Sequence, residues 1–439
     1  MSINWTSLNE EAVKLLRDLV RINTTNPPGN ELEAAIYLQE LLKREGIQAT
    51  IYEKSPQRAN LVAKLSGNGS KRPLLMLAHL DVVTANPAQW SHDPFGGEIA
   101  DGYLWGRGTL DMKGMLTMEV LTMLLLKRSG IELERDLILV AAADEEVGGI
   151  EGMEWLIKQE IPGLKEAEFV INEGGEGSLR DGVPVYSCQS GEKGLLWVKM
   201  SLKGTPGHAS VPLGDNSILG MAEILRKIGQ TKLPVTLSRT ARGFLQGLAV
   251  QKKIQLPQGE AELDASLMEF SDNFLREELT TQAMFYNTIS PTMLKASEKT
   301  NVLPEICEAT LDCRLVPGET PMSFLTKLKE IVDDERVTYE ILQQAVPTES
   351  RLDTALFRAM QKSVQQEEPN SILVPFLSPG CTDSRFFRHL GIAAYGFMPV
   401  LLTDREVQRM HGIDERLSIE NLERGTRILY QAVKEVVAN

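Results

Sequence analysis

Three apolar, strand-length runs of this chain each end in side chains that bind metal ions. They are residues 73–78 before His79, residues 137–143 before Glu145 and Glu146, and residues 169–171 before Glu173. Nearly continuous apolar runs of this length are typical of strands buried on both faces of a parallel sheet. In an open α/β sheet, ligands bind beyond the carboxyl ends of the strands. The sequence therefore predicts an α/β fold whose mostly parallel sheet brings these side chains to one edge.

The order of the predicted helices and strands changes twice along the chain. Helices and strands alternate in residues 1–189 and again in residues 346–439, as in βαβ units around a mostly parallel sheet. Residues 190–345 predict instead the order β-α-β-β-α-β of a smaller, ferredoxin-like α+β unit, in which residues 235–290 carry mixed helical signals. Because 439 residues are too many for one core, we predict a discontinuous α/β domain that the smaller domain interrupts.

Composition indicates which partners and which cellular compartment to expect for this chain. The net charge of −14 argues against a nucleic-acid partner. The first residues show neither the basic nor the apolar region of a secretory signal, and no apolar run approaches the roughly 18 residues that span a bilayer. Four scattered cysteines are expected to be reduced: Cys188, Cys307, Cys313 and Cys381. We therefore expect a cytoplasmic protein without a membrane partner.

Two further residues, Asp111 and His411, extend the set of metal-binding types. Asp111 follows a glycine-rich stretch that begins at Gly106, where it could also cap the next helix. Histidine and carboxylate side chains are ligands of zinc and similar ions. So many anionic ligands favour a pair of metal ions bridged by a carboxylate.

The neighbours of these ligands suggest further roles. Asp81 stands two residues after His79, where it can accept the proton of the ring nitrogen that a metal does not use. Glu145 and Glu146 follow an apolar run, so burial of their charges is costly unless cations compensate. Because adjacent side chains diverge, one glutamate can bind metal while the other acts as a general base on metal-bound water.

Six motifs carry a resemblance to a known family. They are Ala78-His-Leu-Asp81, Gly106-Arg-Gly-Thr-Leu-Asp-Met-Lys-Gly114, Asp144-Glu-Glu146, Asn172-Glu-Gly174, Gly204-Thr-Pro-Gly-His208 and Met410-His-Gly412. In this order and over nearly the whole chain, they resemble the di-zinc metallopeptidase family of aminoacylase, glutamate carboxypeptidase, vacuolar carboxypeptidase S and succinyl-diaminopimelate desuccinylase.

The resemblance implies a role for each residue. Asp111 would bridge two zinc ions, with His79 and Glu173 on one ion and Glu146 and His411 on the other. The implied catalytic residues are Glu145 as the general base, Asp81, and His208. The residues 1–189 and 346–439 would form the catalytic domain. The inserted residues 190–345 would form a lid and dimerisation domain, from which His208 reaches the active site of the partner subunit in a homodimer.

Five other residues match family positions that bind the carboxylate of the substrate or line its pocket: Asn301, Arg314, Gly380, Thr382 and Arg385. An arginine fork suits a carboxylate, although either arginine could instead form a structural salt bridge.

The implied function is hydrolysis of the amide bond in N-acyl amino acids or short peptides with a free carboxylate. Zinc-bound hydroxide would attack, with Glu145 as the general base, and cobalt or manganese could replace zinc. Two alternatives stay open. One is a deacylase of a biosynthetic intermediate, of the desuccinylase or acetylornithine-deacetylase type, and the other is a non-catalytic relative that binds amino acids.

Overall fold

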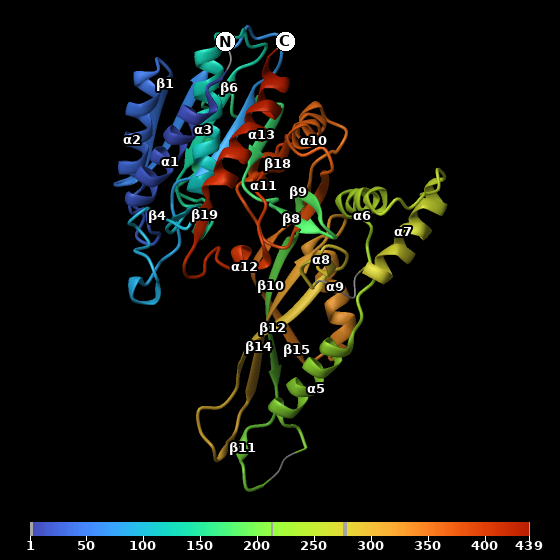
Figure 1. Ribbon diagram of the computed structural model, residues 1–439. Coiled ribbons are helices and arrows are strands. Elements are labelled where there is room, and N and C mark those ends of the chain that lie inside the picture. The colour runs from blue at the N-terminus through green and yellow to red at the C-terminus, as the bar shows by residue number, and fades with distance from the viewer. Residues whose placement is uncertain (1–2, 212–213, 275–278, 439) are drawn as a thin grey trace. The chain divides into compact units, whose positions relative to one another are not determined.

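The computed structural model describes residues 3–211, 214–274 and 279–438, which form two compact units (Figure 1). The first unit contains Met1–Ser190, Ser350–Phe376 and Thr382–Asn439, and the second contains Gly191–Glu349 and Leu377–Cys381. The sequence predicts domain limits at 189/190 and 345/346, and it does not predict the short segment Leu377–Cys381 in the second unit.

The centre of the first unit is a sheet whose middle strands run parallel. Strand β3 (Leu74–His79) lies between β6 (Leu137–Ala142) and β7 (Phe169–Asn172) and is parallel to both. Strand β18 (Ala393–Gly396) is parallel to β7 on its other side. The carboxyl ends of β3, β6 and β7 therefore meet at one edge, and the predicted α/β class with a mostly parallel central sheet is confirmed.

Antiparallel strands extend this sheet on both sides. Strands β1 (Gln48–Ser55) and β2 (Arg58–Leu65) continue it beyond β6, and β9 (Val183–Glu192) continues it beyond β18. The remaining strands of this unit are β8 (Gly177–Arg180) and β17 (Ile372–Ser378), which pair with β9, and a small sheet of β19 (Arg416–Ser418), β5 (Tyr103–Trp105) and β4 (Glu98–Ala100).

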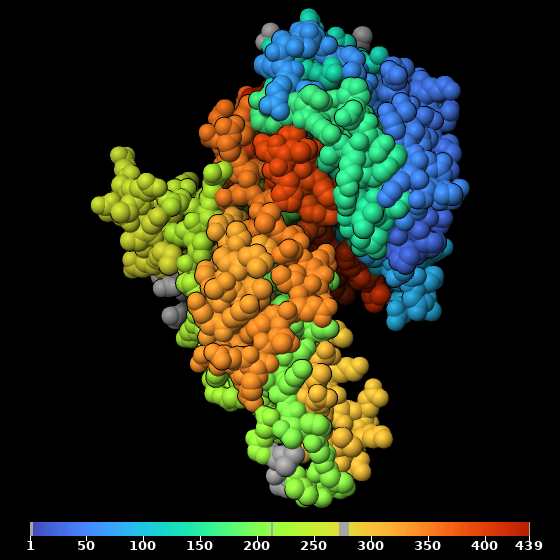
Figure 2. All heavy atoms as spheres, turned by 180° about the vertical axis from the view of Figure 1, so that it is seen from behind, coloured from blue at the N-terminus to red at the C-terminus, as the bar shows by residue number. Residues whose placement is uncertain are grey.

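Helices cover both faces of the sheet, and each face has its own apolar core. The larger core includes residues of α1 (Trp5–Arg21), α2 (Glu31–Arg44), α3 (Lys113–Ser129), α10 (Ala355–Glu367) and α13 (Ile419–Val437). The smaller core includes residues of α4 (Met153–Lys158) and α11 (Ser384–His389), and the green segment with α4 lies beside the orange-red segment with α11 in Figure 2. Helix α12 (Asp404–Val407) completes the unit.

The second unit is built on a four-stranded antiparallel sheet in the order β12-β14-β10-β15. These strands are β12 (Thr288–Lys295), β14 (Ile306–Leu315), β10 (Gly194–Lys203) and β15 (Val337–Ala345). Helices α5 (Ser217–Gln230) and α9 (Pro321–Val332) share one apolar core with this sheet and lie along it in Figure 1. The chain order of these elements is the β-α-β-β-α-β order expected from the sequence.

The segment 235–290 of the second unit is mainly helical. It contains α6 (Arg239–Gln251), α7 (Glu260–Phe274) and α8 (Leu279–Gln282), and β12 begins within it. Helix α6 begins at the N-cap Ser238, whose hydroxyl accepts a hydrogen bond from the backbone of Ala241. The short strands of this unit are β11 (Gly207–His208), which pairs with β13 (Val302–Leu303), and β16 (Thr348–Glu349), which pairs with the end of β9.

The cysteines and the helices bear on two expectations drawn from composition. Cys188, Cys307 and Cys313 are buried, and no disulfide joins any of the four cysteines, all of which lie in the described part of the chain. Within the described residues, no helix combines the length and the apolar character needed to cross a bilayer. The cytoplasmic location stays a prediction from the sequence.

Candidate active site

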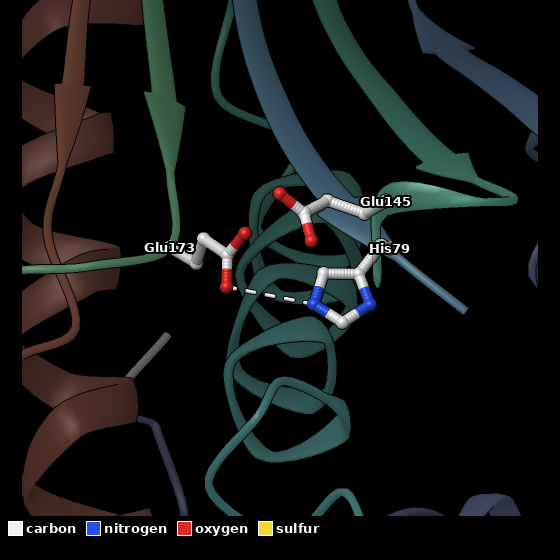
Figure 3. A group of neighbouring side chains, drawn as sticks. All are labelled: His79, Glu145 and Glu173. Atoms are coloured by element: carbon white, nitrogen blue, oxygen red, sulfur yellow. Dashed lines mark ion pairs between the residues drawn. The ribbon is translucent and has the colours of Figure 1, made fainter. Parts of the chain in front are cut away.

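The strand ends place the predicted ligands together. His79 is the last residue of β3, Glu145 and Glu146 lie in the short 3-10 helix η2 (Glu145–Val147) after β6, and Glu173 follows β7. Figure 3 shows the side chains of His79, Glu145 and Glu173 pointing toward one another from these three strand ends. Parallel neighbours with a common direction produce this convergence.

Asp111 lies between two histidines. Its Oδ1 is 3.0 Å from Nε2 of His79, and its Oδ2 is 2.9 Å from Nε2 of His411. His79 Nε2 also lies 3.5 Å from Glu173 Oε2, and His411 Nε2 lies 3.1 Å from Glu146 Oε2. Each oxygen of the Asp111 carboxylate therefore faces a different pair of side chains, and each pair consists of one histidine and one glutamate.

The donor atoms suit divalent cations. Two groups have their donor atoms within 4.8 Å of one another: His79 with Glu145 and Glu173, and His79 with Asp111 and Glu146. Glu146 Oε1 is buried and has no hydrogen-bond partner among the described residues, which fits an oxygen intended for a cation. Histidine nitrogens and carboxylate oxygens together are the donor set of zinc and related ions. In this grouping Glu145, like Glu173, lies close enough to His79 to share a cation with it.

Desolvation and neighbouring charges shift the pKa values of the side chains in this cluster. Burial, with the charge of Glu173 next in size, raises the pKa of Glu145 well above its usual range. Burial also raises the pKa of Glu173 to about 7, although His79 opposes this shift. Hydrogen bonds to Asp111 and Glu146 raise the pKa of His411 to about 10. The carboxylates thus require positive charge close by, which protonated histidines or metal cations can supply.

Asp81 organises the backbone of the glutamate pair. The carboxylate of Asp81 is completely buried and accepts hydrogen bonds from the N–H groups of Glu145 (3.1 Å) and Glu146 (3.2 Å). The sequence assigns this carboxylate to the second ring nitrogen of His79, yet Nδ1 lies closer to the Asp81 carbonyl oxygen (2.9 Å) than to Oδ1 (3.5 Å). The carbonyl oxygen of Asp81 contacts Nδ1 of His79, since the carboxylate of Asp81 accepts hydrogen bonds from the two backbone N–H groups.

Glu415 has a matching role that the sequence analysis missed. Its buried carboxylate accepts hydrogen bonds from the backbone N–H groups of Leu110 (2.7 Å) and Asp111 (3.1 Å). Its other oxygen receives the guanidinium of Arg107 at 2.5 Å. Glu415 follows His411 closely in the sequence, and this proximity to a predicted ligand is the only signal that could have indicated it.

Thr382 and Arg385 join the loops that carry the glutamates. Asn172, which precedes Glu173, donates to Thr382 Oγ1 at 3.4 Å. Arg385 donates to the carbonyl oxygens of Thr382 (3.0 Å) and Gly148 (2.9 Å). The structure therefore brings these two predicted substrate-binding residues to the loops after β6 and β7.

The other predicted site residues belong to the second unit. His208 in β11 is exposed, and its Nδ1 accepts a hydrogen bond from the backbone N–H of Ser210 at 3.2 Å, so the ring proton is on Nε2. The carbonyl oxygen of Asn301 accepts from the backbone of Ala209, which places Asn301 beside His208.

Arg314 is paired within its own unit. Its Nε and Nη2 donate to both oxygens of Asp312 at 2.7 and 3.0 Å. Its Nη1 donates to the carbonyl oxygen of Pro379 at 3.2 Å, next to Gly380. Arg314 therefore forms a salt bridge with Asp312 in this structure.

The chain is similar to known amide hydrolases along most of its length. It is 30% identical over 396 residues to the human N-fatty-acyl-amino acid synthase/hydrolase PM20D1, with 87% of this chain and 78% of the relative covered. It is 26% identical over 433 residues to aminoacylase-1 of Sus scrofa, with 97% of this chain and 95% of the relative covered.

Two solved structures share the fold. The M20 family metallo-carboxypeptidase Sso-CP2 from Sulfolobus solfataricus has a TM-score of 0.71 at 22% identity, with 97% of this chain and 99% of that chain covered. The YXEP protein of Bacillus subtilis, a dinuclear metal binding peptidase from the M20 family, has a TM-score of 0.63 at 12% identity, with 97% and 98% covered. At these identities the likeness concerns the fold alone.

The model of peptidase family M20/M25/M40 matches residues 75–435. This match covers every metal-ligand candidate at the strand ends, and it confirms the resemblance that the motifs indicate. The chain therefore belongs to peptidase family M20/M25/M40, a family of metal-dependent hydrolases.

Proposed function

We propose that this chain hydrolyses the amide bond of N-acyl amino acids or short peptides that carry a free carboxylate, and that it uses two zinc ions. The observation that carries the proposal is the position of Asp111, whose two carboxylate oxygens face His79 and His411 at 3.0 and 2.9 Å. A carboxylate shared in this way suits a bridge between two divalent ions. The substrate class is supported by the names of the relatives, a hydrolase of N-fatty-acyl amino acids and an aminoacylase.

The proposed ligands divide into two sets that share Asp111. His79 and Glu173 complete one set, and Glu146 and His411 complete the other. Zinc suits this mixture of nitrogen and oxygen donors, and cobalt or manganese would fit as substitutes because such donors discriminate poorly among divalent ions. Bound there, the two ions would polarise the amide carbonyl and lower the pKa of a water molecule.

Glu145 is the proposed general base. Its carboxylate lies beside the imidazole of His79 and the carboxylate of Glu173 in Figure 3, whereas the carboxylate of its neighbour Glu146 meets His411. Glu145 accepts the proton of the attacking water and passes it to the leaving amine. Asp81 supports this role by holding the backbone N–H of Glu145 at 3.1 Å.

His208 is proposed to stabilise the developing oxyanion in the active site of a partner subunit. Because Nδ1 accepts from Ser210, the proton on Nε2 is available for donation to an oxyanion. The outer strand β12 exposes Met293 and Leu294 by 69% and 61%. An edge strand with exposed apolar side chains suits a symmetric interface, so the second unit is the proposed dimerisation domain and lid.

The free carboxylate of the substrate is proposed to bind Asn301, Arg314, Gly380, Thr382 and Arg385. Arg314 would exchange its bidentate pair with Asp312 for the substrate, since both partners are carboxylates and require the same fork. The helices of residues 235–290 are proposed to shape the pocket for the acyl group or the side chain.

Substitutions at the adjacent glutamates should separate the base from the ligand. Glu145→Gln should keep the metal content of the wild type and reduce kcat by about 10²–10⁴, the usual effect of general-base removal. Glu146→Ala should lower the metal content itself. Metal analysis and steady-state kinetics on both variants check this. Loss of metal from Glu145→Gln alone would reverse the assignment of the pair.

Removal of the metals should abolish hydrolysis because the ions would supply the charge that polarises the carbonyl and lowers the pKa of water. Dialysis against a chelator should eliminate turnover, and addition of zinc or cobalt should restore it. The metal content is measured by elemental analysis at each step, with a mock-dialysed sample as the control. Full turnover by protein shown to be free of metal would contradict the proposal.

A panel of substrates should show the need for a free carboxylate. N-acyl amino acids and dipeptides are compared with the same compounds whose carboxylate is converted to an amide, and amine release is measured. The amidated compounds should lose about 10–100-fold in kcat/KM, the effect of losing a hydrogen bond between charged groups. Equal rates on both forms would remove the carboxylate from the proposed recognition.

Mixing two inactive variants should reveal whether His208 acts in the partner subunit. In a mixed dimer of His208→Ala and Glu145→Ala, one site would lack both groups and the other would keep both. Activity should therefore reappear after subunit exchange, and each homodimer alone serves as the control. No recovery, in a mixture shown by native mass spectrometry to contain the mixed dimer, would place His208 in its own subunit.

A further inference from the structure

We propose that Arg58 and Asn26 are positioning residues that hold the turn 144–146 in the conformation that presents Glu145 and Glu146. Neither residue belongs to the motifs that carry the family resemblance. The inference rests on the proposed function, because it assigns Glu145 and Glu146 to proton transfer and metal binding.

The turn itself has an unfavourable backbone. Asp144, the residue directly before η2, has φ 71° and ψ 13°, in the left-handed region that a residue with a Cβ rarely adopts. A single residue of this kind persists where its surroundings hold it there. The side chain of Asp144 is 3% exposed, so those surroundings are protein groups.

Three donors hold the carboxylate of Asp144. Oδ1 accepts from Nη2 of Arg58 at 2.6 Å and from Nδ2 of Asn26 at 3.1 Å. Oδ2 accepts from the backbone N–H of Glu151 at 3.0 Å. The turn is therefore fixed by its first side chain, and two of the donors come from distant parts of the chain.

Arg58 is itself held in one orientation. Its Nε donates to Oε2 of Glu31 at 2.9 Å, and its Nη2 donates to Oε1 of the same carboxylate at 2.9 Å. Glu31 is completely buried. Gly29 lies against the guanidinium, and a Cβ at that position would stand 2.3 Å from Nε of Arg58, so the residue without a side chain leaves room for it.

Asn26 joins Asp144 to Asp81. Its Nδ2 donates to Oδ2 of Asp81 at 2.8 Å as well as to Oδ1 of Asp144. Both partners are carboxylates, which only accept, so the amide must present its NH₂ group to both. Asp81 in turn accepts from the backbone N–H groups of Glu145 and Glu146. A continuous series of contacts thus runs from the Glu31–Arg58 pair to the backbone of both glutamates.

Arg135 provides a matched control. The turn 144–146 follows β6, whereas Arg135 lies before that strand. The side chain of Arg135 is 4% exposed against 13% for Arg58, and its Nη1 pairs with Glu168 at 2.7 Å. Removal of either arginine breaks the ion pair of a largely buried guanidinium, which should lower stability in both cases, and by less at Arg135 because Glu168 is 38% exposed. Only Arg58 contacts the turn before Glu145.

The test compares Arg58→Met and Arg135→Met in the full-length, metal-loaded protein. Arg58→Met should lower kcat by about 10–100-fold with KM near that of the wild type, and should weaken cobalt binding by a similar factor, the usual range for residues behind metal ligands. Cobalt affinity is measured by the visible absorption of the bound ion in competition with a chelator. Arg135→Met should keep both values and lose only thermal stability.

A second variant covers the case in which Arg58→Met does not fold. Arg58→Lys keeps the charge but cannot reach Glu31 and Asp144 with one planar fork, so its kcat and cobalt affinity should lie between those of the wild type and the methionine variant. Wild-type kcat and cobalt affinity in folded Arg58→Met, or in Arg58→Lys where only that variant folds, would overturn the inference. The failure of the proposed function is separately visible, since Glu145→Gln would then remain active while cobalt affinity still tests Arg58.

Discussion

The carboxylate of Asp111 is the contact on which the arrangement of the site depends. Its two oxygens meet His79 at the end of β3 and His411 from the last part of the chain at 3.0 and 2.9 Å. The first segment is fixed by pairing inside the central sheet, and the second precedes β19 of the small sheet. One side chain therefore brings together segments that share no strand pairing, and its two oxygens divide the surrounding ligands into two sets.

Two buried carboxylates behind this centre, Asp81 and Glu415, hold the turns that carry the ligands. Asp81 binds the N–H groups of Glu145 and Glu146, and Glu415 binds those of Leu110 and Asp111. Burial of an ionised carboxylate is costly unless hydrogen bonds or charges compensate. For Asp81, burial opposes ionisation, but His79 and the donors around it lower its pKa. These carboxylates act on the backbone, so they fix the turns that carry the candidate ligands Glu145, Glu146 and Asp111.

Much of the fold, and the positions at which the candidate ligands meet, could be predicted because both depend on local patterns. The runs before His79 and Glu173 are apolar and end in polar side chains. This pattern predicts two buried strands and places the polar side chains at their carboxyl ends, on one edge of the sheet. Strands β8 and β9 were not predicted because neither shows a continuous apolar run or a regular alternation of burial. The contacts of Arg58 and Asn26 with Asp144 join residues far apart in sequence, and no local pattern reports them. The pair of Arg314 with Asp312 is by contrast local, because alternate residues of a strand lie on the same face.

The different surroundings of Glu145 and Glu146 explain how adjacent, identical residues can serve two purposes. Glu146 Oε2 lies 3.1 Å from His411, a histidine whose pKa is raised to about 10 by its carboxylate neighbours, so Glu146 faces positive charge. Glu145 lies half-buried next to Glu173, and desolvation followed by that negative charge raises its pKa. A neighbouring carboxylate favours the protonated form of a carboxyl group, as a proton acceptor in catalysis requires. This difference supports the proposed division, in which Glu145 transfers the proton and Glu146 binds metal from one shared backbone turn.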